Sequence, residues 1–197
     1  MDETLNGRLR SAIECLLFVS GKALTVQRMS EVLKLDKAAV EHAIQGLMED
    51  YTTRIGGLQI VEVAGGYKMC TRSEFSDVVE SLRENMVRPR RLSAAALETL
   101  AIISYKQPLS RVEIEEIRGV DVGGVLATLM EYGLVRIAGR RRVAGKPLLY
   151  GTTPDFLEWF GLSSLKDLPR AEDLAVGRHY DLFSSTAEAQ EGRESQE

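Results

Sequence analysis

Few side chains in this 197-residue sequence are placed for metal binding or covalent catalysis. Cys15 and Cys70 are isolated thiols, and neither His42 nor His179 lies in a cluster with other ligands. Metal sites need several such side chains at short spacings, and disulfide frameworks need paired cysteines. We therefore expect no metal site and interpret both thiols as small hydrophobic core side chains in a reducing compartment.

Motifs for catalysis and cofactor binding are also missing. The sequence has no phosphate-binding loop, no glycine fingerprint after a strand and no nucleophile elbow. Glu115 and Glu116 are adjacent, so on a helix their carboxylates diverge and do not share a substrate. We predict that the chain is not an enzyme, that it needs no cofactor, and that it works by binding other molecules.

Basic residues gather in two short clusters whose chemistry suits phosphate groups. One cluster is Arg88, Arg90 and Arg91, and the other is Arg140, Arg141, Arg142 and Lys146. Clustered Lys and Arg bind nucleic acid through its backbone without reading its sequence. Two interpretations stay open: an auxiliary nucleic-acid contact, or a solvated linker and hairpin tip.

The elements that carry these residues form an internal repeat. Positions in the first half return in the second half at an offset of 84, which shrinks to 82 and then 81 further along. Examples are Ala12 with Ala96, Leu47 with Leu129, and Phe75 with Phe156. Two copies of one small module are therefore expected, the second with slightly shorter connections.

Each module has the pattern of three helices followed by a two-stranded hairpin. In the first, apolar residues keep helical spacing over residues 5–20, 26–33 and 36–51, and alternation over 58–70 predicts the hairpin. In the second, Ser110 and Glu113 form a capping box, and residues 134–152 form the hairpin. This order predicts two tandem winged-helix domains, mainly α with small β wings.

Four segments follow from this pattern. Residues 1–71 form the N-terminal winged-helix domain, and residues 72–91 form a connecting helix and basic linker. Residues 92–169 form the C-terminal winged-helix domain with a final helix. Residues 170–197 form a tail that is acidic and poor in branched apolar residues, which predicts disorder.

Base reading by the third helix of either module is not favoured. Such a helix reads DNA with Arg, Lys, Asn or Gln. Residues 36–51 carry Lys37 and Gln45 among four acidic residues, and residues 121–132 carry no basic residue. No apolar run is long enough to span a bilayer, and the N-terminus resembles no signal peptide, so a cytoplasmic location is expected.

The second module also carries a dense family signature. It includes Leu92-Ser93, residues 95–108, Glu113-Ile114, residues 117–120, Gly139-Arg140, residues 145–147 and 149–153, Phe156-Leu157, residues 160–162, Ser164-Leu165 and residues 167–169. This signature closely resembles the segregation and condensation protein B (ScpB) family, and a looser likeness extends over residues 8–71. Arg141 and Arg142 add basic content that departs from the family pattern.

The resemblance implies a non-enzymatic bacterial chromosome-segregation protein. Members of the family pair as homodimers, largely through the N-terminal winged helix. They bind the kleisin ScpA, which bridges the heads of an SMC ATPase, and the complex compacts and partitions chromosomes at the nucleoid. DNA contact by such a protein is indirect or weak.

Candidate contact residues are apolar and aromatic side chains suited to a peptide groove. For the kleisin they are Ile114, Ile117, Arg118, Tyr150, Phe156 and Trp159. For the dimer they are Leu9, Ile13, Leu16 and Leu17. Each could instead belong to a core. The alternative function is a winged-helix transcriptional regulator that binds DNA through its basic wing and linker, with steep salt dependence.

Overall fold

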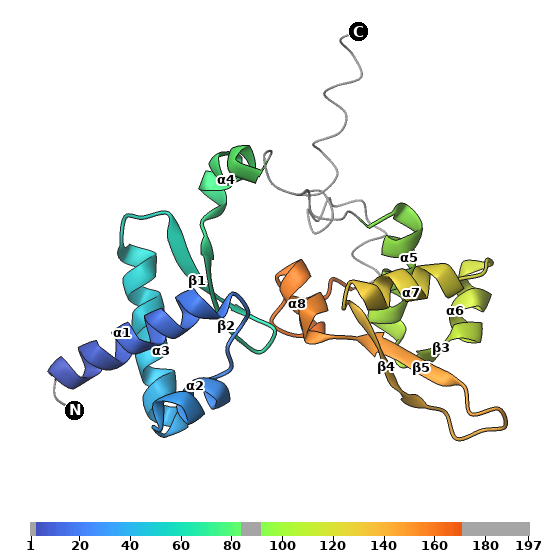
Figure 1. Cartoon of the computed structure of the whole chain (residues 1–197), viewed down its shortest axis with the longest axis horizontal. Helices are drawn as coiled ribbons and strands as arrows, with labels where there is room; N and C mark the ends of the chain where they lie inside the picture. Colours follow the sequence, from blue (N-terminus) through green and yellow to red (C-terminus); the bar gives the residue numbers. More distant parts are fainter. Residues whose placement is uncertain (1–2, 84–91, 171–197) are drawn as a thin grey trace, which may run out of the picture. The chain divides into compact units, whose positions relative to one another are not determined.

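The chain divides into two compact units, shown in the computed structural model of Figure 1. The structure describes residues 3–83 and 92–170. Unit 1 contains Met1–Pro89 and Leu157–Ser164, and unit 2 contains Arg90–Phe156 and Leu165–Glu197. Helices with small antiparallel sheets make up both units, which confirms the expected mixed α and β class. The expected acidic tail and the cluster of Arg88, Arg90 and Arg91 lie outside the described residues.

Unit 1 begins with three helices and a hairpin. The elements are α1 (Glu3–Ser20), α2 (Val26–Leu33), α3 (Lys37–Thr53), β1 (Leu58–Val63) and β2 (Gly66–Thr71). The Asp36 carboxylate accepts the backbone N–H of Ala39 at 2.8 Å, so it satisfies a donor that the start of α3 leaves unpaired. Thr25 does the same for α2 through the N–H of Arg28. These caps explain why the helices begin where they do.

The core of unit 1 lies where α3 meets α1, α2 and the hairpin. Figure 1 shows α1 crossing α3. The buried side chains are Ile13, Leu17, Met29, Val40, Ala43, Ile44, Leu47, Tyr51, Ile60 and Tyr67. The backbones of Leu24 and Tyr67 exchange two hydrogen bonds of 2.9 Å, which attach the segment before α2 to the edge of β2.

The expected connecting helix follows the hairpin. It consists of a 3-10 turn, Ser73–Phe75, and α4 (Ser76–Arg83). Met86, the last apolar position of the predicted helix, lies outside the described residues. Val78 and Leu82 are both exposed, whereas Val79 is half-buried, so α4 is only partly covered within the described chain.

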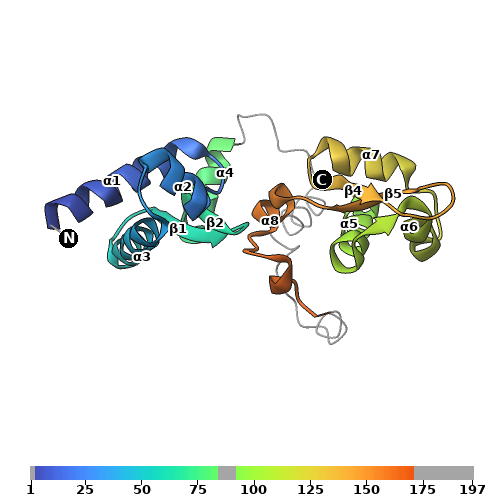
Figure 2. The same cartoon turned by 90° about the horizontal axis from the view of Figure 1, so that it is seen from below.

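Unit 2 repeats the order of helices and hairpin with one added strand. Its elements are α5 (Ala94–Lys106), β3 (Leu109–Ser110), α6 (Arg111–Arg118), α7 (Gly123–Glu131), β4 (Val135–Arg140) and β5 (Leu148–Thr152). The short β3 pairs with β5, giving the sheet order β3-β5-β4. In Figure 2, α7 lies on one side of the β4–β5 hairpin, with α5 and α6 on the other.

The last helix, α8 (Pro154–Phe160), contributes residues to both units. The Glu158 carboxylate accepts the N–H of Ala23 at 3.1 Å and the Nζ of Lys68 at 2.9 Å. The N–H of Ala64 donates to the carbonyl of Leu162 at 2.8 Å. These bonds explain why residues 157–164 group with unit 1, although the sequence pattern assigned the whole helix to the second domain.

We predict that Gly66→Ala destabilises the protein. A Cβ at Gly66 would lie 2.7 Å from the backbone carbon and oxygen of Leu24, where only a backbone shift makes room. Overpacking of this kind costs about 1–3 kcal/mol. Urea unfolding of the full chain measures the loss.

Gly7→Ala in α1 is the matched control, because a Cβ there meets nothing within 4 Å. Replacing a helical glycine by alanine stabilises by about 0.5–1 kcal/mol. Equal stability of Gly66→Ala and the unmodified chain would contradict the tight approach of Leu24.

Candidate functional site

The solvent-facing sides of α3 and α7 offer little to a DNA phosphate backbone. On α3 the exposed residues include Glu41, Gln45 and Glu49. Asp50 lies on the same helix and binds Arg10 at 2.8 Å. The sequence of α7 contains no Lys or Arg, and its exposed positions include Gly124 and Met130. Because phosphate binding depends on clustered positive charge, neither helix is suited to enter a DNA groove.

An apolar surface lies on α1 of unit 1. Phe18 is 72 % exposed and Val19 is 80 % exposed, and neither was among the residues predicted for a dimer contact. Of the predicted residues, Leu9 and Leu16 are half-buried, whereas Ile13 and Leu17 are buried in the core of unit 1. Two of the four predicted dimer residues are therefore core residues with almost no surface to offer a partner.

The signal for Val19 was present in the sequence, whereas Phe18 falls on the opposite side of the helix from Leu9 and has no such signal. Leu9, Leu16 and Val19 are separated by seven and three residues, a spacing that places them on one side of a helix. This side adjoins the one that fills the core. An apolar stripe wider than the core needs is typical of a helix with a second partner.

Three of the six residues predicted for kleisin binding are core residues. Ile114, Tyr150 and Phe156 are all buried, so their side chains pack within the chain. Ile117 and Trp159 are 45 % and 46 % exposed. They belong to different units, Ile117 to unit 2 and Trp159 to unit 1.

Arg118, the sixth predicted residue, is largely buried and pairs with Glu98. This pair joins the end of α6 to α5. A buried guanidinium needs such a partner, because removing it from water is costly. Its observed contact is therefore within unit 2.

A shallow depression on α6 was not predicted. It is lined by Val112, Glu115, Glu116, Gly119, Val120 and Asp121. Val112 and Val120 are both exposed, and the Arg111 guanidinium bonds the carboxylates of Glu115 and Asp121 beside them. Sequence spacing missed these valines because they fall off the Ile114 face on which the apolar pattern of this helix was based.

The loop between β4 and β5 carries the second basic cluster. Residues 140–147 form this basic loop, in which Arg140, Arg142 and Lys146 are exposed. The Arg141 guanidinium instead donates to the Glu113 carboxylate at 2.8 Å. One of the four predicted cations is therefore held by an acidic partner on α6.

Glu113 connects the start of α6 with the basic loop. The predicted capping box is present: the Ser110 N–H donates to the Glu113 carboxylate at 2.8 Å, and the Ser110 hydroxyl accepts the Glu113 N–H. The backbone N–H of Ser110, then Arg141 and the Ser110 hydroxyl, lower the pKa of Glu113 to about 2. These donors favour the ionised carboxylate.

The described ranges, residues 3–83 and 92–170, contain neither a candidate metal site nor a membrane-spanning helix. In that part of the chain no three His, Cys, Asp or Glu side chains gather in a way that would hold a metal ion. None of its helices combines the length and apolar character needed to cross a bilayer. Cys15 and Cys70 are free thiols, but the prediction that both belong to the core is wrong for Cys15, which is exposed on α1. Cys70 is half-buried, and burial raises its pKa.

Comparison with known proteins decides the family. The model of the family "Segregation and condensation complex subunit ScpB" matches residues 11–171. The chain belongs to the ScpB family. A segregation and condensation protein B from Moorella thermoacetica is 51 % identical over 172 residues, covering 86 % of each chain. One from Symbiobacterium thermophilum is 46 % identical over 160 residues, covering 81 % of this chain and 72 % of that protein.

Solved structures of ScpB proteins are also similar. ScpB from Mycobacterium tuberculosis is 31 % identical, with 82 % of this chain and 98 % of that chain covered and a TM-score of 0.40. A dimer of an ScpB N-terminal domain complexed with an ScpA peptide is 25 % identical, with 39 % and 95 % covered and a TM-score of 0.37. Membership of the ScpB family places the role of the chain in segregation and condensation, and the transcriptional-regulator alternative is not favoured.

We predict that Glu113→Gln lowers the thermal midpoint in a pH-dependent way. The folded-state pKa of about 2 lies below the usual 4.5, so the carboxylate stabilises the fold above about pH 4.5, and this contribution is lost as the pH falls toward 2. The difference in midpoint between the two proteins should therefore be largest near neutral pH and shrink below pH 4.5. Thermal melts from pH 7 to pH 2 measure it.

Glu116→Gln removes an exposed carboxylate from the same helix and serves as the control. Its melts should follow those of the unmodified chain over the whole range. If the Glu113→Gln difference stayed constant down to pH 2, the carboxylate would not have the assigned role.

Proposed function

We propose that the chain is a non-enzymatic scaffold subunit in chromosome segregation and condensation. It acts as a homodimer that binds the kleisin ScpA and, through ScpA, the SMC ATPase, in the cytoplasm at the nucleoid. The observation that carries this proposal is the family match over residues 11–171. The lack of cationic faces on α3 and α7 supports a role in protein binding rather than base reading.

We further propose that each unit is built on a winged-helix domain. In unit 1 the helices α1, α2 and α3 precede the β1–β2 hairpin, and in unit 2 the helices α5, α6 and α7 precede the β4–β5 hairpin. A third helix packed on the first, followed by an antiparallel hairpin, supports this assignment. The proposed domains keep the limits 1–71 and 92–169, joined by 72–91 and followed by an acidic tail, except that residues 157–164 group with unit 1.

The dimer contact is assigned to the exposed side of α1. Val19 lies on the same side of α1 as the half-buried Leu9 and Leu16, and the exposed Phe18 is its neighbour near the end of the helix. Burial of apolar area drives association, and aromatic side chains supply a large part of it. A two-fold dimer places the same residues on both partners, so Phe18 and Val19 of one α1 can meet those of the other.

The ScpA contact is assigned to Ile117 of α6, the predicted residue of unit 2 whose apolar side chain is exposed. Half-exposed apolar side chains bind a peptide when they close over it and exclude water. Val112 of α6 and Val120, which follows the helix, are further exposed apolar residues of unit 2 and line the shallow depression. The proposal makes no use of Ile114, Tyr150 or Phe156, which are buried.

The first test concerns the dimer. We predict that Phe18→Ser with Val19→Ser weakens self-association at least tenfold, because the apolar surface of α1 is lost while the core is untouched. Light scattering after size exclusion, over a range of concentrations, measures the mass.

The matched control is Val32→Ser with Ile55→Ser, which removes two exposed apolar residues elsewhere in unit 1. The control should remain a dimer. A Phe18 and Val19 variant that stays dimeric at low concentration would count against the α1 contact.

The second test concerns ScpA. We predict that Ile117→Asp reduces the affinity for purified ScpA at least tenfold, because a charged group would have to be buried against the peptide. Calorimetry with the full chain measures binding. Met130→Asp, which changes an exposed apolar residue of α7, is the control and should bind like the unmodified chain. Failure of the unmodified chain to bind ScpA would overturn the proposed function.

A further inference from the structure

The basic loop is the part of unit 2 with an unbalanced charge. Residues 132–154 contain five basic residues and no acidic residue. The remainder of 92–170 contains five basic and nine acidic residues. Positive charge is thus gathered on the β4–β5 hairpin, and the rest of the unit is acidic. A local excess of this kind attracts polyanions even when the whole domain is nearly neutral.

Hydrogen bonds hold the basic loop in one conformation. The N–H of Arg141 donates to the carbonyl of Pro147 at 3.0 Å, and the N–H of Lys146 donates to the carbonyl of Val143 at 3.0 Å. The Arg140 guanidinium donates to the carbonyl of Lys146 at 3.3 Å. Gly145, with a φ of 81°, takes the left-handed conformation that the turn requires. Because the loop is already ordered, a ligand pays little conformational entropy to bind it.

Arg141 holds the basic loop in place, whereas the three other basic residues of the loop are exposed and can bind a ligand. Its guanidinium bonds Glu113 on α6, which fixes the base of the loop against the body of the unit. Arg140, Arg142 and Lys146 are exposed, and within the described ranges none of them has an acidic partner. Three cations therefore face solvent from a rigid hairpin.

The shape of this element suits a groove of duplex DNA. Figure 1 shows the loop extending beyond the helices of its own unit. The major groove is wide enough for a two-stranded β ribbon. Val143 at the tip is 54 % exposed, and it is an apolar side chain that the fold of the unit does not use.

We propose that the basic loop binds the phosphate backbone of double-stranded DNA directly and without sequence preference, through Arg140, Arg142 and Lys146. This contact is separate from the ScpA and dimer contacts proposed above, and it uses residues that they leave free. Three neutralised phosphates correspond to a slope of about −3 for the logarithm of affinity against the logarithm of salt concentration. The contact is weak, so it assists a complex already on DNA and does not select a site.

The test is fluorescence anisotropy with a labelled 30-base-pair duplex of random sequence and the full chain, between 50 and 200 mM salt. The triple variant Arg140→Gln, Arg142→Gln, Lys146→Gln should bind at least tenfold more weakly at 50 mM salt, with a slope near zero. A second duplex of unrelated sequence should give the same affinity as the first, because phosphates carry no sequence information.

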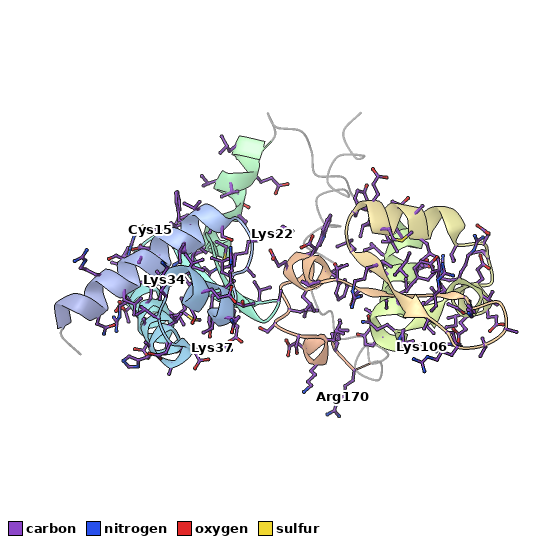
Figure 3. All side chains as sticks on the ribbon, turned by 60° about the horizontal axis from the view of Figure 1, so that its bottom comes forward. Cys15, Lys22, Lys34, Lys37, Lys106 and Arg170 are labelled. Carbon is purple, nitrogen blue, oxygen red and sulfur yellow. The ribbon has the colours of Figure 1, made fainter. Side chains whose placement is uncertain are left out.

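The matched control removes three exposed cations from unit 1. Its changes are Arg8→Gln, Lys34→Gln and Lys37→Gln, of which Lys34 and Lys37 are labelled in Figure 3. Lys34 and Lys146 both have positive φ, so the two triple variants match in net charge and in backbone strain. The control should bind DNA within twofold of the unmodified chain.

Three outcomes would overturn the proposal: equal losses in both triple variants, full DNA affinity in the loop variant, or loop-dependent binding to anionic vesicles without binding to DNA. Binding of ScpA by the loop variant is measured in parallel and should be unchanged. If the unmodified chain did not bind ScpA, the proposed scaffold function would be wrong, but the DNA contact would be unaffected. The two proposals therefore fail independently.

Discussion

The surface that each unit offers depends on the burial of the helix before its hairpin. Five residues of α3 at helical spacing are buried: Val40, Ala43, Ile44, Leu47 and Tyr51. Uncovering a buried Leu or Ile costs several kcal/mol, so the helix cannot rotate to present another face. In α7, Leu126 and Leu129 have the same effect. The solvent faces of both helices are thereby fixed, and they lack the clustered cations that a DNA reader needs: α3 exposes one Lys, Lys37, among several acidic residues, and α7 contains no Lys or Arg.

Polar contacts at turns and helix ends, and not core packing, hold the basic loop on unit 2. Glu113 illustrates it, because one carboxylate both satisfies the start of α6 and holds Arg141 of the basic loop. A charged hydrogen-bond acceptor with several donors is stronger than a neutral one. The basic loop is therefore connected to the helices of unit 2 by the contact between Arg141 and Glu113. Substitutions at the other residues of the loop leave the core of the unit unchanged.

Local rules in the sequence predicted the elements well. Ser110 and Glu113 were predicted as a capping box and do form one at the start of α6, because capping depends on residues only three positions apart. Periodicity also located the apolar faces of the helices. An apolar face indicates that some partner covers it, but it does not show whether that partner is the same unit or another chain. Ile114, Tyr150 and Phe156 are covered by their own unit, whereas Phe18 and Val19 are not. Telling these cases apart requires tertiary contacts, which one sequence does not contain.

The unit to which residues 157–164 belong also depends on tertiary contacts that the sequence alone does not reveal. The sequence predicted a final helix in the second domain, and α8 (Pro154–Phe160) is that helix. Its partners are far away in sequence: Glu158 bonds Ala23, 135 residues distant, and Lys68, 90 residues distant. A half-buried carboxylate needs such donors. Sequence spacing cannot identify Ala23 as one of them, because its donor is a backbone N–H, which nearly every residue has. The internal repeat marks where copied sequence begins and ends, whereas burial and hydrogen bonding determine which unit a segment joins.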